Sequence, residues 1–256
     1  MNSLGFRYRN TRKKGVLLRS DLKKRRKFAR DTLNAYPGGT DSLWKEGISF
    51  YFDGTGFVHK NNPLGMAMAP KGKAWRLPKE GLAYGCTGKG RKEGVHQVRF
   101  FVGISYGRGV VMCEQYEGRI SGKKMEQFAK DHFEDTFDRC ALSTVAGGRR
   151  VLQDGCPSQN DKRVLRAMQA MDAETFAIPA RSPDLNPIEN LFHLVGKRLE
   201  EQVLRDQIFF ENDKTFARRV KKTIENFPAD VIDKIIDSMP GRLRLVLKAR
   251  GGRIKY

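Results

Sequence analysis

The chain has 256 residues, of which 39% are hydrophobic, so it can bury a core in one large domain or two small ones. It carries 49 Lys and Arg against 29 Asp and Glu, which gives a formal net charge of +20 and a pI near 10.0. This excess favours nucleic acid or an anionic membrane surface as a partner, and we expect no membrane role because no run of about 18 apolar residues exists. The basic N-terminus lacks the apolar stretch of a secretory signal.

The N-terminal region is the most basic part of the chain. Twelve Lys or Arg and a single acid, Asp21, lie between Arg7 and Arg30. Residues 7–14 are typical of an extended basic arm, and Ser20 is a good N-cap for a helix from Asp21 to about Tyr36. We expect these basic residues to contact DNA phosphates: Arg7, Arg9, Arg12, Lys13, Lys14, Lys23, Lys24, Arg25, Arg26 and Lys27. The run at 23–27 also fits a solvated helix face or a nuclear localisation signal.

Strand patterns begin after Gly47. Residues 48–53 alternate in polarity and predict a strand that ends at Asp53. Residues 96–105 and 110–117 predict a hairpin with its turn at 106–109. The intervening 60–95 segment is rich in Gly, Pro and Lys, and we expect a long loop or insertion there with one short strand near Trp75.

Helices and strands alternate in the second half of the chain. Ser121 predicts a helix to about Phe137, and Asn186 and Pro187 predict the start of a helix that runs to about Gln202. The other expected elements are strands at 150–153 and 175–178 and helices at 162–171, 213–226, 229–238 and 241–249. This order predicts an α/β fold, a mixed sheet with flanking helices, preceded by a basic arm and helix. We expect a linker region at 1–40 and a main domain at 41–256.

Four cysteines are spread along the chain, at 86, 113, 140 and 156. They form no CxxC pair and have no histidine at ligand spacing, so we do not expect them to build a zinc site. Isolated cysteines fit a reducing intracellular compartment, where they act as small buried hydrophobic residues.

Three carboxylates follow a strand or open a helix: Asp53, Asp154 and Glu189. Chemistry on a phosphodiester needs an activated oxygen nucleophile and a stabilised leaving oxygen, and two divalent ions about 3.5–4 Å apart supply both. Mg²⁺ and Mn²⁺ prefer oxygen ligands, so carboxylates in a basic chain indicate a metal-dependent enzyme acting on a polyanion such as DNA.

Each carboxylate also has a simpler interpretation. Asp53 and Asp154 both precede glycine, as a turn-initiating aspartate does. Glu189 lies in a first helical turn, where the helix dipole favours an acid by about 0.3–1 kcal/mol. We expect Asp184 to belong to the turn before that helix and not to bind metal.

Four segments carry a family resemblance. The segment 182–189, Ser-Pro-Asp-Leu-Asn-Pro-Ile-Glu, looks like the third catalytic block of mariner-superfamily transposases, in particular the Tc branch. Residues 153–157, Gln-Asp-Gly-Cys-Pro, resemble the second block, and 51–53, Tyr-Phe-Asp, resemble the first. The 34 residues between Asp154 and Glu189 match the spacing of that branch, and the tail at 236–252 is similar to its C-terminus.

The resemblance implies a ribonuclease-H-like fold and a DNA transposase that cleaves and joins strands with divalent metal. Asp53, Asp154 and Glu189 would be the metal ligands, for two ions of Mg²⁺ or Mn²⁺. It also implies a homodimer that acts in the nucleus on double-stranded DNA at transposon ends and target.

Three positions depart from the family pattern: Gly54 stands where an acid is common, Gly155 where Asn is usual and Gln159 where His is usual. These changes concern local geometry more than metal binding. Family members begin with two helix-turn-helix modules, and this chain starts near the end of the second, so we do not expect it to read a repeat sequence.

Two other functions fit the sequence less well. A truncated or domesticated derivative would keep the fold and bind DNA or a partner without catalysis, as the missing modules suggest. Another nuclease of the same fold, such as a ribonuclease H or an integrase, is disfavoured by the 182–189 block and the C-terminal tail.

Overall fold

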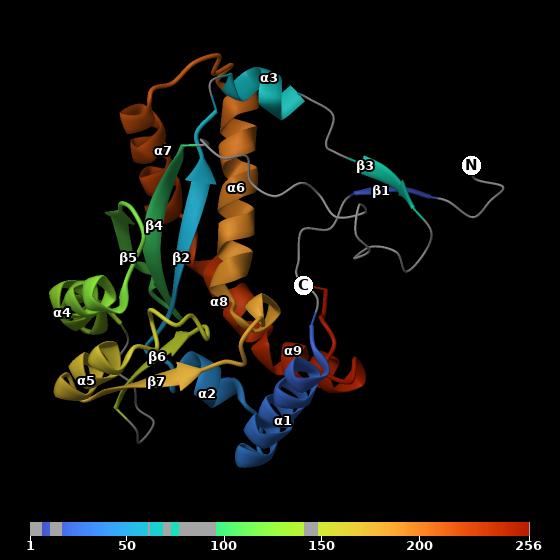
Figure 1. Ribbon diagram of the computed structural model, residues 1–256, viewed down its shortest axis with the longest axis vertical. Helices are drawn as coiled ribbons and strands as arrows, with labels where there is room; N and C mark the ends of the chain where they lie inside the picture. Colours follow the sequence, from blue (N-terminus) through green and yellow to red (C-terminus); the bar gives the residue numbers. More distant parts are fainter. Residues whose placement is uncertain are drawn as a thin grey trace.

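The computed structural model describes residues 7–10, 17–60, 62–68, 73–76, 96–140 and 148–255, with the backbone alone at 7–10 and 73–76. Its centre is a five-stranded mixed sheet with strand order β5-β4-β2-β6-β7 (Figure 1). β2 and β5 run antiparallel to β4, whereas β2, β6 and β7 are parallel. The strands are β2 (Phe50–Val58), β4 (Gln97–Ser105), β5 (Gly109–Tyr116), β6 (Arg149–Gln153) and β7 (Ala173–Ala177). A separate antiparallel pair joins β1 (Arg7–Asn10) to β3 (Lys73–Arg76).

Helices cover both faces of this sheet and extend beyond its β7 edge (Figure 1). They are α1 (Arg19–Ala35), α2 (Asp41–Lys45), α3 (Pro63–Met68), α4 (Gly122–Arg139), α5 (Lys162–Ala170), α6 (Ile188–Arg205), α7 (Asp213–Glu225), α8 (Ala229–Asp237) and α9 (Met239–Lys248). A short 3₁₀ helix, η3 (Pro183–Leu185), leads into α6. Among the described residues, no helix is both long and apolar enough to cross a membrane.

Side chains of β2 alternate between the two faces, as strand geometry requires. Phe50 and Phe52 pack with α4 and α5, and both rings meet Phe133 of α4 edge-on, at centroid separations of 5.3 and 5.1 Å. The same alternation turns Tyr51 and Asp53 to the other face. The aromatic cluster therefore fixes the orientation of the strand that carries Asp53.

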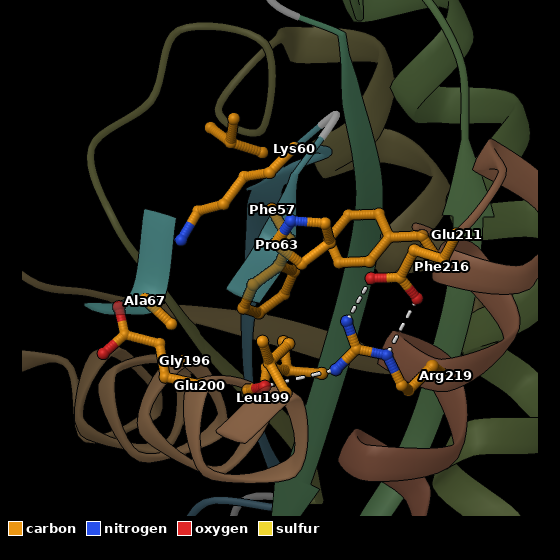
Figure 2. A pocket seen from close by; sticks show the side chains of 12 residues that line it. Phe57, Lys60, Pro63, Ala67, Gly196, Leu199, Glu200, Glu211, Phe216 and Arg219 are labelled. Atoms are coloured by element: carbon orange, nitrogen blue, oxygen red, sulfur yellow. Dashed lines mark hydrogen bonds and ion pairs between the residues drawn. The ribbon is translucent and has the colours of Figure 1, made fainter. Parts of the chain in front are cut away.

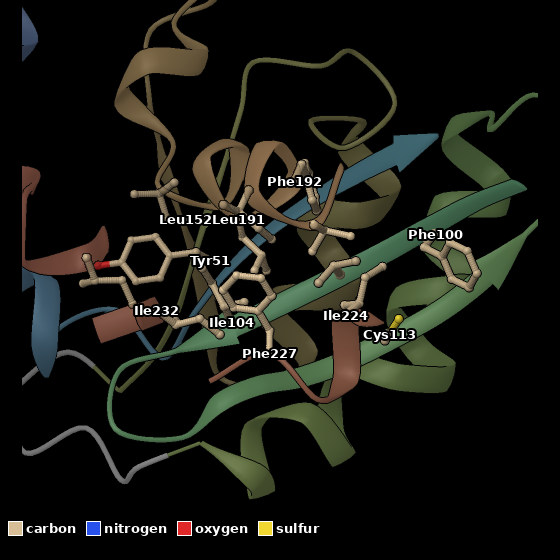
Figure 3. Packing of buried hydrophobic residues seen from close by; sticks show 14 of the residues in the cluster. Tyr51, Phe100, Ile104, Cys113, Leu152, Leu191, Phe192, Ile224, Phe227 and Ile232 are labelled. Carbon is tan, nitrogen blue, oxygen red and sulfur yellow. The ribbon is translucent and has the colours of Figure 1, made fainter. Parts of the chain in front are cut away.

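The opposite face is covered by α6, α7 and α8. Figure 3 shows Tyr51 and Leu152 of the sheet packed with Leu191 of α6, Ile224 near the end of α7 and Ile232 of α8. All five side chains are buried. This packing holds the first turn of α6 over the middle of β2 and the end of β6, where the acidic residues lie.

Most elements expected from the sequence are confirmed, with boundaries within two or three residues. The hairpin at 96–117, the short strand at Trp75 and the helices from 121 to the end of the chain are present. The prediction that the first strand ends at Asp53 is wrong, because β2 continues to Val58. Gly54 does not end the strand: a Cβ there would lie 3.0 Å from the Phe101 ring, so glycine allows this ring to pack against the strand.

Two short helices, α2 and α3, were not expected from the sequence. Arg12, Lys13, Lys14 and Cys86 lie outside the described residues. α1 packs against α9, and its Ala29 belongs to the same buried cluster as α6, α7 and α8. The helix assigned to the linker therefore shares the core of the main domain, and the boundary at residue 40 stays a prediction.

Candidate active site

Asp53 lies in the middle of β2 and is half-buried. One carboxylate oxygen accepts a hydrogen bond from the backbone N–H of Gly54 at 2.7 Å. The other accepts from the side-chain amide of Asn186 at 3.3 Å. Asn186 is fully buried, and its own amide oxygen accepts from the backbone N–H of Ile188 at 3.4 Å. Asn186 thus links the metal-ligand candidate on β2 to the start of α6.

Asp154 is the first residue after β6, which is parallel to β2 and adjacent to it. Its carboxylate accepts from the backbone N–H of Cys156 at 2.7 Å, and its backbone oxygen accepts from the side-chain amide of Asn160 at 2.9 Å. The turn after the strand is closed by these bonds. The strand end and the turn together place Asp154 close enough to Asp53 for its charge to act on that carboxylate.

Glu189 lies in the first turn of α6 and is exposed to solvent. It comes directly after Ile188, which is fully buried and anchors the helix start in the core. The charges of Asp154 and Glu189 both act on Asp53, so the structure brings the three carboxylates together although long stretches of sequence separate them.

Burial is the main cause that raises the pKa of Asp53, which reaches about 7. The negative charge of Asp154 adds to this effect, and that of Glu189 adds less, while hydrogen bonds from Gly54 and Gln159 oppose it. The pKa of Asp154 is also raised, again because of burial. Carboxylates gathered in this way repel one another, and a bound divalent cation would relieve the repulsion.

Asp184 anchors the segment that carries Asn186 and Glu189. Its carboxylate receives both terminal nitrogens of Arg25 at 2.7 Å and the backbone N–H of Ile254 at 3.0 Å. Its backbone oxygen accepts from Arg242 at 3.2 Å. Asp184 therefore has a structural role in the turn before α6, as the sequence indicated.

The expectation that Arg25 contacts DNA does not fit its position. The side chain is fully buried and, besides Asp184, donates to the backbone oxygens of Gly251 and Gly252 at 2.8 and 3.1 Å. Gly251 has a φ of +86°, and a Cβ there would lie 2.2 Å from the backbone oxygen of Leu22. Arg25 thus lies in a buried contact between α1, η3 and the C-terminal segment, which we call the seam.

The neighbours of Arg25 face solvent instead. Lys23, Lys24, Arg26 and Lys27 are exposed on α1. Only the backbone of Arg7 and Arg9 is described, in β1. DNA contact by these six residues stays a prediction.

Two pockets flank the carboxylates. One, of about 300 Å³, lies beside Asp53 and is lined by Gly54, Arg99, Phe101, Tyr116, Gly118, Arg119, Ile120, Cys156, Ser158 and Gln159. The other, of about 670 Å³, includes Glu189 and His193. Arg99 and Arg119 were not expected at the site, because they lie on and after the hairpin strands and belong to no catalytic block. Their positive charge beside Asp53 suits a phosphate group.

A third pocket, of about 170 Å³, lies toward the far end of β2, where Phe57, α3 and α6 meet the start of α7 (Figure 2). None of the three carboxylates lines it. It is mainly apolar and contains the ion pair between Glu211 and Arg219. We therefore place the candidate active site at the carboxylates and not at this cavity.

Residues 49–210 match the protein family described as DDE superfamily endonuclease, a match that covers more than half of the chain and includes all three carboxylates. The chain belongs to this family. The family assignment supports the location of the site, because the matched segment includes β2, β6 and the start of α6.

Curated relatives confirm the resemblance to the Tc branch. The chain is 32% identical over 133 residues to the transposable element Tc1 transposase of Caenorhabditis elegans, covering 52% of this chain and 46% of that protein. It is 32% identical over 164 residues to the Tcb2 transposase of Caenorhabditis briggsae, covering 60% of this chain and 57% of that protein. The chain spans about half the length of the curated relatives it matches.

Solved structures confirm the ribonuclease-H-like fold. The catalytic domain of Mos1 mariner transposase matches with a TM-score of 0.63 at 13% identity and covers 94% of this chain and 99% of that chain. The Mos1 transposase paired-end complex with left transposon end matches with a TM-score of 0.69 at 15% identity, over 94% of this chain and 65% of that chain. At these identities the likeness concerns the fold alone.

Proposed function

We propose that this chain is the catalytic domain of a DNA transposase, which hydrolyses a phosphodiester bond and joins the freed 3′-hydroxyl to a target strand. The observation that carries the proposal is the meeting of three carboxylates: Asp53 on β2, Asp154 at the end of β6 and Glu189 in the first turn of α6. The family assignment and the Tc1 and Tcb2 relatives support the same function.

The proposed cofactor is Mg²⁺ or Mn²⁺, as two ions. The donor set fits, because it offers carboxylate oxygens with no thiol or imidazole among the three residues. When bound, such ions lower the pKa of the attacking water and stabilise the leaving oxygen. Structures of the Mos1 catalytic domain with Mn and with Mg support this choice by analogy.

We assign different roles to the three carboxylates. Asp53 and Asp154 are held by backbone hydrogen bonds and would share the ions. Glu189 is exposed at the helix start, so it would hold the second ion and orient the attacking water. Arg99 and Arg119, beside Asp53, would position the phosphodiester, while the exposed basic residues of α1 would bind phosphates further along the duplex.

The test is nicking of supercoiled DNA by the purified chain with Mg²⁺ or Mn²⁺. We expect the parent and Asp135→Asn, an exposed change on α4, to nick DNA, and Asp154→Asn to lose nicking while it still binds DNA. DNA affinity should fall steeply with salt, by a log–log slope of about −0.9 for each neutralised phosphate. Equal nicking by Asp154→Asn and the parent would show that the carboxylates are not the active site.

Calorimetric titration with Mn²⁺ separates catalysis from binding alone. The proposed enzyme binds Mn²⁺ and loses that binding in Asp154→Asn. DNA binding without any Mn²⁺ binding by the parent would instead identify a derivative that has kept only the fold.

We further infer that the chain acts on double-stranded DNA, as a homodimer and in the nucleus. The Mos1 complex with a transposon end supports the DNA partner by analogy, and the family resemblance alone supports the dimer and the nucleus. Light scattering on the DNA complex measures the stoichiometry. The location of a fluorescent fusion, with and without the basic residues of α1, tests nuclear action. A monomeric complex or a fusion excluded from nuclei would contradict them.

A further inference from the structure

A second cluster of metal-ligating side chains lies about 20 Å along β2 from Asp53, toward the far end of the strand. His59 directly follows β2, His96 directly precedes β4, and Asp213 opens α7. Their ligand atoms, both Nδ1 atoms and a carboxylate oxygen, lie within 4.8 Å of one another. The cluster is separate from the carboxylate site, and the proposed reaction does not use it.

A hydrogen bond fixes the His59 ring at Nε2, the nitrogen that does not face Asp213. Its Nε2 lies 2.7 Å from the backbone oxygen of Glu211, and because a carbonyl only accepts, Nε2 carries a proton and donates it. Figure 2 shows how Glu211 is fixed: Arg219 binds its carboxylate and also donates to the backbone oxygen of Leu199 at 3.2 Å. A histidine whose far nitrogen donates to a carbonyl is the usual arrangement of a metal ligand.

The contact between His59 and Asp213 has a geometry that suits a metal ion between the two side chains. Nδ1 of His59 lies 2.6 Å from a carboxylate oxygen of Asp213, and Nδ1 of His96 lies 3.0 Å from the same oxygen. With its proton on Nε2, a neutral His59 turns a lone pair toward this oxygen, which is repulsive. A metal ion placed between the two side chains removes the repulsion, because it accepts the lone pair of Nδ1 and offsets the charge of the carboxylate. The same metal ion would also bind Nδ1 of His96, which lies beside the same carboxylate oxygen.

We propose that His59, His96 and Asp213 bind one transition-metal ion, for which Zn²⁺ is the best fit. Zn²⁺ binds imidazole nitrogen and carboxylate oxygen at about 2.0–2.2 Å, which sets ligand atoms about 3.3 Å apart in a tetrahedron. The two distances from the Nδ1 atoms to the Asp213 oxygen, 2.6 and 3.0 Å, therefore lengthen by less than about 1 Å on binding. The side chains of His96 and Asp213 are 60% and 52% exposed, so both can adjust and a water can complete the coordination.

The ion would join three segments that the fold already brings together. The backbone N–H of His59 donates to the backbone oxygen of His96 at 3.1 Å, so the two histidines close the ends of the segment between them. Asp213 adds the start of α7 to this junction. Metal binding would thus fix α7 to the β2–β4 pair without touching the carboxylate site.

The experiment uses the untagged chain, freed of metal with EDTA and transferred to buffer with excess Mg²⁺. Mg²⁺ occupies the carboxylate site but disfavours imidazole, so added Zn²⁺ reports on the second cluster. We expect calorimetry to give one Zn²⁺ per chain at this cluster, and Tm to rise by roughly 5 °C or more at a hundredfold excess over Kd. Imidazole NMR signals of His59 and His96 should shift with the same stoichiometry.

Paired variants assign the site. His96→Gln and Asp213→Asn, both at exposed positions, should weaken Zn²⁺ binding at least tenfold. His132→Gln and Asp230→Asn, the latter also in a first helical turn, should leave it unchanged. Retained Tm in EDTA shows that the variants fold. Absence of Zn²⁺ binding by the parent, or equal binding by the parent and both cluster variants, would overturn the proposal and leave a protonated histidine–carboxylate pair.

Discussion

Arg25 of α1 and Asp184 of η3 form a buried bidentate ion pair, with both nitrogen–oxygen distances at 2.7 Å. We expect Arg25→Met to destabilise the fold by about 3–5 kcal/mol, because it leaves a buried carboxylate without its partner. Urea unfolding followed by circular dichroism measures the change.

The neighbouring residue supplies a matched control. Arg26 is exposed, so Arg26→Met should leave the unfolding free energy within about 0.5 kcal/mol of the parent while it weakens DNA binding. An Arg25→Met protein as stable as Arg26→Met would show that the ion pair contributes nothing.

The same ion pair predicts a pH dependence of stability. Burial acts to raise the pKa of Asp184, but hydrogen bonds from Arg25 and Ile254 and the charge of Arg25 outweigh it, so the pKa is lowered. A carboxyl whose folded pKa lies below its unfolded value of about 3.9 stabilises the fold above that pH and loses this contribution as the pH falls further. The stability difference between parent and Asp184→Asn should be constant from pH 7 to 5 and shrink below about pH 4. A stability difference between parent and Asp184→Asn that grows as the pH falls would contradict the lowered pKa of Asp184.

Asp53 should show the opposite trend. Its pKa of about 7 lies above the unfolded value, so in the absence of metal its ionisation destabilises the fold as pH rises from about 4 to 7. In EDTA at pH 8 we expect Asp53→Asn to be more stable than the parent by on the order of 2 kcal/mol, with the gain lost near pH 4. Mg²⁺ should stabilise the parent and not the variant. Thermal unfolding at both pH values, with and without Mg²⁺, measures these effects, and equal stability in EDTA at pH 8 would argue against a strained carboxylate.

Asn186 should act as a positioning residue for Asp53. Asn186→Asp keeps the shape and the acceptor for the Ile188 N–H but removes the donor to Asp53 and adds a charge. We expect nicking at pH 8, at an Mn²⁺ concentration that saturates the parent, to fall at least tenfold, in line with the effect of residues that orient metal ligands. Asn226→Asp, the same change at the end of α7, should keep the parent rate. Rates restored by higher Mn²⁺ concentration would place the defect in metal affinity.

Gly251 is required by the close approach of α1. Gly251→Ala adds a Cβ that meets the backbone oxygen of Leu22 at 2.2 Å, so the seam around Arg25 must open. We expect Gly251→Ala to lower the free energy of unfolding by about 3 kcal/mol or more. Gly107→Ala isolates the cost of the positive φ, since that position has a φ of +69° and open space around it, and should cost only about 1–2 kcal/mol. If both variants lost the same free energy of unfolding, the backbones of Gly251 and Leu22 would be able to move apart without an energetic cost.

The places of the three candidate carboxylates in the fold were largely predictable from the sequence, because local patterns mark them, while their role as metal ligands stays a prediction. Asp154 follows a short apolar strand, and Glu189 follows an Asn-Pro helix start. The residues next to each carboxylate therefore indicate where it lies in the fold. Asp53 was assigned to a strand end because Asp-Gly usually begins a turn. The packing of Phe101 against Gly54, a contact between residues 47 positions apart, continues the strand and is invisible in a local pattern.

Contacts between distant residues account for the rest of the differences. Arg25 stands within a run of basic residues, and only its partner Asp184, 159 positions later, distinguishes it from them. Arg99 joins the site through the pairing of β4 with β2, which brings a hairpin residue beside Asp53. His59 and Asp213 meet through the docking of α7. Such pairings depend on the completed fold.

The seam at Gly251 has a consequence for how gene copies of this chain should be judged. A premature stop codon just before Gly251 would leave the three carboxylates, all five strands of the central sheet and every helix of the described chain in the reading frame. It would nevertheless remove the carbonyls that hold Arg25 and the Ile254 N–H that holds Asp184. A copy counted as intact from its acidic triplet would then encode a chain without the contacts that hold α1 and η3 together, so we expect the last few codons to matter for stability although they lie far from the three acidic ones.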